Sequence, residues 1–430
     1  MQGPVYGLET DLTAEQTCGV LSNPMEHGEA SKLALYGVAD YNWNVSAYNA
    51  IDNWERSLVD VTPEAHDAYR TFAIHSCDTE TGYRRIESWE TKSFRLADYN
   101  KKDYDNLYAE FDRVEKAPAI MERDCKNALL MKELRPWLAE FKKLGTRGKN
   151  TLTLMSQFKD GKYEAFWNGY ISNRMSTADM AAYQAHKSGT MKLQPFYENG
   201  MDDMAIEFFK KVAGKTPAFY KGVGTYKSLG TTQNKLMLDN DSTTFYHSGA
   251  SQNTGDWIGL DLGAVRPVRE VRILQGRNSV DDVDYFDNVI VEASADGKTW
   301  TPLTGELKKT YIINWKGNPV EARYVRMRKL QSDKKSWCAV REFVVNPVNP
   351  ENLAFKVESA DMLGAMNCFD ENPCSSFKSE GSLAFGVEKG TKSYTMLVNL
   401  PKAGGVVLKQ YNKKGKLVAS TPIEGNMAKV

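Results

Sequence analysis

The pattern of hydrophobic and polar residues changes near residue 215. Before this point, apolar residues recur at spacings of three and four, the repeat that places them on one face of an α-helix. After it, apolar and polar residues alternate, which is the repeat of a β-strand with one buried face. The sequence therefore predicts a helical half followed by a half built of strands.

Several segments of the first half have the helical repeat. The two clearest apolar stripes are Tyr104, Leu107, Tyr108, Phe111 and Val114, and Leu134, Trp137, Leu138, Phe141 and Leu144. Gly145 follows the second stripe, and a glycine often marks the residue after which a helix ends. Further helices are predicted around residues 163–171 and 201–212. Packed against one another, these helices predict a bundle over roughly residues 95–212.

The first ninety residues have a different pattern. Gly19-Val20-Leu21 is a short apolar run that predicts a strand, and Asn23, Pro24 and Glu26 follow it with the residue types that begin a helix. Residues 33–39 are either the next strand or a continuation of that helix, because periodicity alone does not separate the two. A strand followed by a capped helix is the unit of an α/β fold, and one such unit needs neighbouring strands. We therefore expect the chain to begin inside a domain.

Beyond residue 225, the alternation predicts an antiparallel β-sandwich. Strands are predicted at residues 257–262, 271–273, 289–294 and 324–328, and Asp296-Gly297 predicts a hairpin turn. Residues 238–248 align without gaps with residues 369–379, which predicts a second copy of the sandwich. This copy ends at a predicted hairpin at residues 412–415 and lacks the closing strands, so we expect the C-terminus to be cut as well.

Charge and composition exclude several classes of function. The chain has 55 basic and 55 acidic residues, so no overall field favours nucleic acid or an anionic membrane as a partner. No stretch approaches the roughly 18–20 apolar residues of a membrane span. The six cysteines form no CxxC pair and the five histidines no HExxH motif, so a zinc site is not indicated. Cys368 and Cys374 are equally compatible with a disulfide and with two thiols.

Three oxygen-bearing side chains lie close together in one predicted loop of the sandwich. They are Asp239, Asp241 and Thr244. Hard cations prefer such oxygen ligands, which favours a calcium site. The alternative is an Asx-turn, in which the same side chains bind nearby backbone groups.

The strand half resembles a discoidin domain, or coagulation factor 5/8 type C domain, of the sugar-binding kind (carbohydrate-binding family 32). The matching motifs are Asp239 to Tyr246, Trp257 to Gly263, Tyr324 to Arg328 and Trp337 to Phe343. The resemblance implies a jelly-roll fold and a glycan of the GlcNAc or galactose type as partner. It also implies that Glu342 completes a structural calcium site. Tyr285, Phe286 and Trp315 are aromatic residues that either stack on a sugar or pack within the domain.

The first two hundred residues resemble glycoside hydrolase family 84. The matching motifs are Gly3 to Gly7, Ser22 to His27, Ala39 to Asn44, Phe72 to His75 and Leu134 to Leu138. The fold implied is the end of a (β/α)8 barrel followed by an α-helical bundle and the antiparallel sandwich. We expect four parts: residues 1–92 from the barrel, 93–215 for the bundle, 216–348 for the sandwich and 349–430 for the truncated second sandwich.

The resemblance implies a retaining β-N-acetylglucosaminidase of the hyaluronidase-like or O-GlcNAcase type. In that family the acetamido oxygen of the substrate attacks the anomeric carbon, and two adjacent aspartates assist it. This sequence begins after the strand that carries them, so we assign no catalytic residue and expect the chain alone to be inactive. No cofactor is needed for catalysis. The pairs Asp202-Asp203 and Asp281-Asp282 are interpreted as solvated charges.

Four residues match the sugar-contacting edge of the family's pocket: Trp43, Asn44, Asn49 and Ser76. Asn49 stands where the family has an Asp, and Ser76 where it has an Asn, so part of the charge assistance is lost. The alternative makes Trp43 a packing residue and Asn44 a turn former. The family implies a secreted, periplasmic or cell-surface bacterial protein. The competing hypothesis is a non-catalytic glycan-binding or adhesion protein with a helical spacer.

Overall fold

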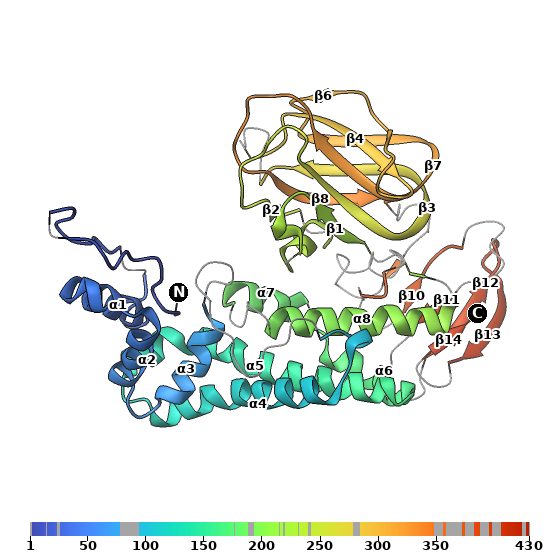
Figure 1. Ribbon diagram of the computed structural model, residues 1–430. Helices are drawn as coiled ribbons and strands as arrows, with labels where there is room; N and C mark the ends of the chain where they lie inside the picture. Colours follow the sequence, from blue (N-terminus) through green and yellow to red (C-terminus); the bar gives the residue numbers. More distant parts are fainter. Residues whose placement is uncertain are drawn as a thin grey trace. The chain divides into compact units, whose positions relative to one another are not determined.

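The computed structural model describes residues 2–13, 15–23, 26–77, 94–175, 177–187, 193–214, 216–217, 220–230, 232–239, 242–277, 284–347, 356–357, 372–374, 382–387, 395–397, 406–423 and 427–429. The chain divides into two compact units. One is Met1–Met204 with Met396–Lys429, and the other is Ala205–Thr395. Figure 1 shows helices along most of the first unit and strands along the second.

The N-terminal part of the first unit is helical where it is described. It contains α1 (Lys32–Trp43), the 3-10 helix η1 (Val45–Ala47), α2 (Ala50–Val61) and α3 (His66–His75). Residues 33–39, which the sequence left open between strand and helix, are therefore helical. Across 2–13, 15–23 and 26–77 there is no strand, so this structure does not show the barrel portion that the resemblance implied.

The strand and the capped helix predicted near residue 20 are wrong. Residues 19–23 have no regular structure, and Leu21 is 98% exposed. The first helix begins at Lys32, well beyond Asn23, and its N-cap residue Ser31 makes no capping hydrogen bond through its side chain. A three-residue apolar run gains a strand's stability only when a partner strand lies beside it, and none does here among the described residues.

The helical bundle is confirmed. Its helices are η2 (Leu96–Asp98), α4 (Lys101–Asp124), α5 (Ala128–Lys159), α6 (Tyr163–Asn173), α7 (Thr177–Ala185) and α8 (Leu193–Ala213). The two predicted stripes lie on α4 and α5, and Phe111 and Phe141 are fully buried. Trp137 and Tyr108 are less buried than the stripes predict, because each lies at the margin of its apolar face.

Gly145 does not end a helix, as its sequence position predicted. It lies within α5, which continues to Lys159. A Cβ atom at Gly145 would lie 2.4 Å from the backbone nitrogen of Glu115 on α4, and one at Gly148 would lie 2.1 Å from the Phe111 ring. These glycines therefore allow α4 and α5 to approach closely, a packing role that a pattern within one helix does not reveal.

The second unit contains the predicted antiparallel sandwich. Its strands are β1 (Lys221–Gly224), β2 (Tyr246–His247), β3 (Trp257–Gln275), β4 (Asn288–Ser294), β5 (Thr301–Pro302), β6 (Leu307–Lys308), β7 (Ile312–Lys329) and β8 (Ala339–Val345). They form one sheet in the order β2-β8-β3-β7-β4-β5, with β1 beside β3 and β6 beside β4, and every pairing is antiparallel. The long strands β3 and β7 bend so that the sheet closes over its own core (Figure 1).

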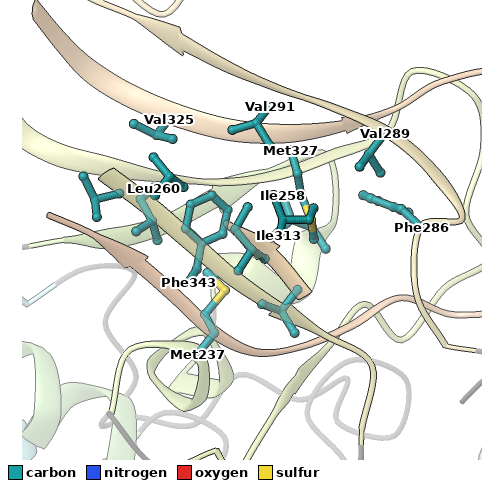
Figure 2. Close-up of a cluster of buried hydrophobic side chains, with 14 of the residues drawn as sticks. Met237, Ile258, Leu260, Phe286, Val289, Val291, Ile313, Val325, Met327 and Phe343 are labelled. Atoms are coloured by element: carbon teal, nitrogen blue, oxygen red, sulfur yellow. The ribbon is translucent and has the colours of Figure 1, made fainter. Parts of the chain in front are cut away.

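The sandwich core consists of the residues that alternate along its strands. Figure 2 shows Ile258, Leu260, Val325 and Met327 pointing into a common interior, and all four are fully buried. The core also includes Met237, Phe286, Val289, Val291, Ile313 and Phe343. The predicted Asp296-Gly297 turn joins β4 to β5, and Gly297 has the positive φ of 74° that this turn requires.

The predicted second sandwich lies mostly outside the described residues. Three two-stranded pairings are described there, of which the longest joins β12 (Val407–Tyr411) to β13 (Leu417–Pro422) around the predicted turn at Gly415. Shorter strands are β9 (Lys356–Val357), β10 (Leu383–Ala384), β11 (Thr395–Leu397) and β14 (Met427–Lys429). Cys368 lies outside the described residues, so the choice between a disulfide with Cys374 and two thiols stays a prediction. The four domain boundaries stay a prediction.

No helix in the described part of the chain has the length and apolar character needed to cross a membrane.

Candidate carbohydrate-binding sites

The corner between α1 and α2 carries three of the four residues assigned to a sugar pocket. Trp43 is the last residue of α1 and is 91% exposed, so the alternative of a packing role is wrong. The side-chain oxygen of Asn44 accepts from the backbone amide of Ala47 and caps η1, as a turn former does. The side-chain oxygen of Asn49 accepts from the backbone amides of Ile51 and Asp52, at 3.0 and 3.1 Å, and caps α2. Capping uses the oxygen of each amide and leaves its NH2 group for another acceptor.

The extended N-terminal segment connects this corner to Ser76. Gly3 lies against Cys77, so closely that a Cβ atom on Gly3 would be 2.4 Å from the Cys77 sulfur. Two residues further on, the carbonyl of Val5 accepts a 2.8 Å hydrogen bond from the hydroxyl of Tyr48. The segment of residues 3–5 thus contacts Cys77, the neighbour of Ser76, and Tyr48, the neighbour of Asn49. The Ser76 hydroxyl is buried and has no hydrogen-bond partner among the described residues.

Burial fixes the protonation state of the residue that anchors this segment. It raises the pKa of Tyr48 to about 12, and the charge of Asp40 adds to the effect. Tyr48 therefore stays a hydrogen-bond donor to Val5 at every physiological pH. The corner presents an indole face and two amide groups, all uncharged, which suits a neutral sugar.

The corner holds no pair of adjacent aspartates. Asp203, interpreted from sequence as a solvated charge, instead accepts from Arg95 Nε at 2.7 Å and from the Leu96 backbone amide. Its role is to hold the segment before α4, which corrects that interpretation. The other pair, at residues 281–282, lies outside the described residues.

One end of the sandwich brings four chain segments together around Ala339. Ala339 pairs with His247 across β8 and β2. Its backbone carbonyl accepts from the amide of Gly276, and its own amide donates to the carbonyl of Asp284, both at 2.8 Å. Residues far apart in sequence are thereby brought together at Ala339, which follows Trp337 by two positions.

Trp337 is the exposed aromatic residue of this end. It is 51% exposed, and its ring stacks on that of His247 with centroids 5.7 Å apart and planes inclined by 20°. At the same end of the sandwich, where Gly276 and Asp284 bind the backbone of Ala339, Arg277 Nε lies 2.9 Å from Asp284 Oδ2. We call Trp337, His247, Arg277 and Asp284 the Trp337 face. An aromatic ring beside a charged hydrogen-bonding pair can stack on the C–H side of a pyranose and bind its hydroxyls.

For the three aromatic residues that the sequence left open between sugar stacking and packing, the structure shows packing. Phe286 is fully buried in the core. Tyr285 packs edge-on against Tyr311 and under the ammonium of Lys334, and Trp315 packs against the core cluster. The sequence analysis did not select Trp337. Its position directly after a run of polar residues at 331–336 could have indicated an exposed aromatic residue in a loop.

The structure describes three of the four residues assigned to a calcium site: Asp239, Thr244 and Glu342. Thr244 Oγ1 lies 2.7 Å from Asp239 Oδ2 and 3.1 Å from the carbonyl of Leu236. Glu342 lies on β8 and is 5% exposed. Asp241 lies outside the described residues, and among the others no three His, Cys, Asp or Glu side chains gather as a metal site.

Comparison with known proteins agrees with both resemblances. Residues 1–74 match the beta-N-acetylglucosaminidase family, residues 87–201 the post-catalytic domain of bacterial GH84 enzymes, and residues 224–343 the F5/8 type C domain. Two successive segments of the chain are therefore similar to parts of bacterial β-N-acetylglucosaminidases, and a third is similar to the F5/8 type C domain. This confirms the families that the sequence motifs indicated.

Solved structures of both kinds are similar to this chain. CpGH84D is 22% identical with a TM-score of 0.41, over 47% of this chain and 37% of CpGH84D. The family 32 module CpGH89CBM32-5 from Clostridium perfringens, solved with GalNAc-β-1,3-galactose, is 17% identical with a TM-score of 0.25, over 29% of this chain and 94% of the module. The module of C. perfringens NanJ, solved with galactose, is 16% identical with a TM-score of 0.25, over 29% and 92%. The chain thus spans little more than a third of CpGH84D.

Proposed function

We propose that this chain is the glycan-binding and substrate-edge portion of a β-N-acetylglucosaminidase that releases terminal β-linked GlcNAc from glycans or glycoproteins. The sandwich binds a GlcNAc- or galactose-type glycan on the Trp337 face. The observation that supports this most directly is the exposed indole of Trp337, stacked on His247 at the end of the sandwich that also carries the Arg277–Asp284 pair. The family matches at residues 1–74 and 87–201 support the assignment to a hydrolase.

The glycan-binding part is tested by calorimetric titration of the whole chain with GlcNAc- and galactose-terminated oligosaccharides. Trp337→Ala removes the stacking surface, and we expect it to weaken binding at least tenfold, or ~1.4 kcal/mol. Tyr411→Ala is the matched control, because Tyr411 is a similarly exposed aromatic residue (58%) on β12, a strand that pairs with β13 and is not part of the sandwich sheet. Equal affinity of the Trp337→Ala variant and the unaltered chain would contradict the proposal.

For the hydrolase part, we propose that Trp43, Asn44, Asn49 and Ser76 line the sugar-contacting edge of the pocket. The reaction would be retaining, with the substrate's acetamido oxygen as nucleophile and two aspartates that orient it and transfer the proton. Asp203 is committed to Arg95 and Leu96 and cannot supply such a pair. We expect the purified chain to show no turnover of an aryl β-GlcNAc glycoside. Turnover that is proportional to the concentration of the chain would overturn this expectation.

We further propose that Asp239, Asp241, Thr244 and Glu342 hold a structural calcium ion. The support is the chemistry of these side chains, since a hard cation prefers carboxylate and hydroxyl oxygens as ligands. Calcium would fix the loop before β2. Millimolar affinity suits an extracellular module, which agrees with the secreted, periplasmic or cell-surface location implied by the family.

The calcium proposal predicts a stability change. Calcium at about 100 times its Kd should stabilise the sandwich by about 2.7 kcal/mol relative to a chelator, measured as a shift of its thermal transition in scanning calorimetry. Glu342→Gln should abolish the calcium dependence, whereas Glu321→Gln, at an exposed position on β7, should keep it. A thermal transition that is unchanged by calcium would show that the loop is an Asx-turn alone.

A further inference from the structure

Two polar side chains without any solvent exposure lie behind the Trp337 face. They are Gln252, in the loop before β3, and Lys329, the last residue of β7, and both are 0% exposed. An amide and an ammonium group in the interior are stable only when their hydrogen bonds are made. Their partners therefore identify which parts of the chain the two residues hold together.

The amide of Gln252 contacts the backbone of the Trp337 loop directly. Its Nε2 lies 3.0 Å from the carbonyl of Trp337, 3.1 Å from that of Tyr285 and 3.3 Å from Ser336 Oγ. The backbone amide of Gln252 donates to the carbonyl of Ser336 at 3.1 Å. One buried side chain thus fixes two consecutive residues of the loop that presents the indole.

Lys329 holds Gln252 in place and links it to a further segment. Its Nζ donates to Gln252 Oε1 at 2.9 Å, to Asp287 Oδ1 at 3.3 Å and to Ser332 Oγ. Ser332 Oγ in turn donates to Asp287 Oδ1 at 2.7 Å. The three protons of the ammonium match three acceptors, which an uncharged or planar side chain would not satisfy in this geometry.

The negative charge of Asp287 belongs to the same network. Partial burial acts to raise the pKa of Asp287, but the hydrogen bond from Ser332 and the charge of Lys329 outweigh it and lower the pKa. Asp287 therefore stays ionised opposite the buried ammonium. The loops at residues 252, 285–287 and 332–337 are joined by fully paired polar groups, and such networks hold a unique arrangement.

We propose that Gln252 and Lys329 are positioning residues for glycan recognition: they hold the backbone of Tyr285, Ser336 and Trp337 so that the indole is presented rigidly on the Trp337 face. The proposal rests on the glycan-binding function proposed above. A preorganised ring binds its ligand without first being ordered. Neither residue needs to touch the glycan, so both act through Trp337.

The experiment compares two buried glutamines in the full chain. Gln252→Met removes the network while keeping the volume of the side chain. Gln275→Met is the matched control, because Gln275 is also 0% exposed and also holds backbone groups, those of Phe286 and Thr310, without contacting the Trp337 loop. We expect both variants to melt earlier, but only Gln252→Met, and likewise Lys329→Met, to weaken glycan binding, by about tenfold.

A double variant separates positioning from a general loss of stability. In a Trp337→Ala chain, Gln252→Met should change the affinity by less than about twofold, because residues that act through one another are not additive. Losses that add in the double variant, or an unchanged affinity of Gln252→Met, would overturn the proposal.

A second readout does not depend on a bound sugar. Acrylamide quenching of Trp337, obtained as the difference from a Trp337→Phe chain, should increase in Gln252→Met and stay unchanged in Gln275→Met. If Trp337→Ala leaves glycan affinity unchanged, the proposed function fails, and this quenching result still decides on the positioning role. Equal quenching of Trp337 in the Gln252→Met variant and the unaltered chain would refute that role.

Discussion

Glu110 shows how single charged residues are used inside the helical bundle. It is 3% exposed, and its Oε1 lies 2.7 Å from Nε2 of His75, which is fully buried on α3. Its second oxygen accepts from Arg113 Nε at 2.7 Å. Burial acts to raise the pKa of Glu110, but the hydrogen bond and charge of His75, together with Arg113, lower it below its usual value. The pair joins the helices of the N-terminal segment to the bundle through paired charges.

This pair predicts a pH dependence of stability. A carboxyl group whose pKa is lower in the folded state stabilises the fold above its unfolded pKa of about 4.3, and this contribution is lost as the pH falls through the folded value. Glu110→Gln should therefore lower the free energy of unfolding by about 1–3 kcal/mol at pH 7 and should flatten its decline below about pH 5. Urea titrations followed by far-UV circular dichroism measure both.

The control for this prediction lies on the same helix. Glu122 pairs with Arg135, and both side chains are more than half exposed. Glu122→Gln should leave the urea midpoint unchanged, since exposed ion pairs are screened by solvent. A pH profile of Glu110→Gln that follows the profile of the unaltered chain would contradict the role assigned to Glu110.

At the scale of elements, the contact between α4 and α5 is set by glycine. Gly145 lies against the Glu115 backbone, which has no rotamer to change, whereas Gly169 on α6 faces the flexible end of Leu154. An alanine favours an isolated helix over glycine by ~1 kcal/mol. Overpacking a rigid interface costs about 1–3 kcal/mol and opposes that gain.

The two glycines are expected to respond differently to alanine. Gly145→Ala should lower the free energy of unfolding of the bundle by about 1–3 kcal/mol, because the helices must move apart. Gly169→Ala should be close to neutral, because Leu154 can turn aside. Thermal melts followed by circular dichroism compare the two, and a Gly145→Ala chain at least as stable as the unaltered one would show that the contact is looser than described.

At the scale of the whole molecule, the equal numbers of basic and acidic residues leave no overall field. A neutral glycan bound by an indole and by hydrogen bonds should therefore gain nothing from long-range attraction. We expect its affinity for the chain to change by less than about twofold between 0.05 and 0.5 M salt, where the Debye length falls severalfold. Calorimetric titrations at the two salt concentrations test this. A steep decrease would show that an acidic glycan is the true ligand.

The regular elements were predictable from local patterns. Ile258, Leu260 and Leu262 alternate in sequence and share the buried face of β3, and the stripes of α4 and α5 repeat as a helix requires. Strand and helix ends were less predictable. The capped helix expected after Asn23 begins only at Lys32, because the start of a helix depends on the packing of its apolar face more than on capping residues.

The two candidate sites also differ in how far the sequence predicted them. Trp43, Asn44 and Asn49 are neighbours in sequence, so their common corner followed from the motif, as did the conformation of Asn44. The Trp337 face did not follow from a motif, since His247, Arg277 and Asp284 come from segments that meet only through backbone contacts with Ala339. Nothing in the sequence indicated that Gln252 and Lys329 are buried, because a polar residue is expected at the surface unless its tertiary partners are known.

The sequence by itself determined the two families, the helical and strand halves and the buried faces of their elements. Side-chain direction repeats with the geometry of helix and strand, so periodicity records which face is buried. The tertiary structure alone decided that Gly145 packs against α4, that Asp203 pairs with Arg95 and that four distant segments meet at Ala339. These contacts depend on which surfaces fit together after the elements have formed, and no local repeat encodes that fit.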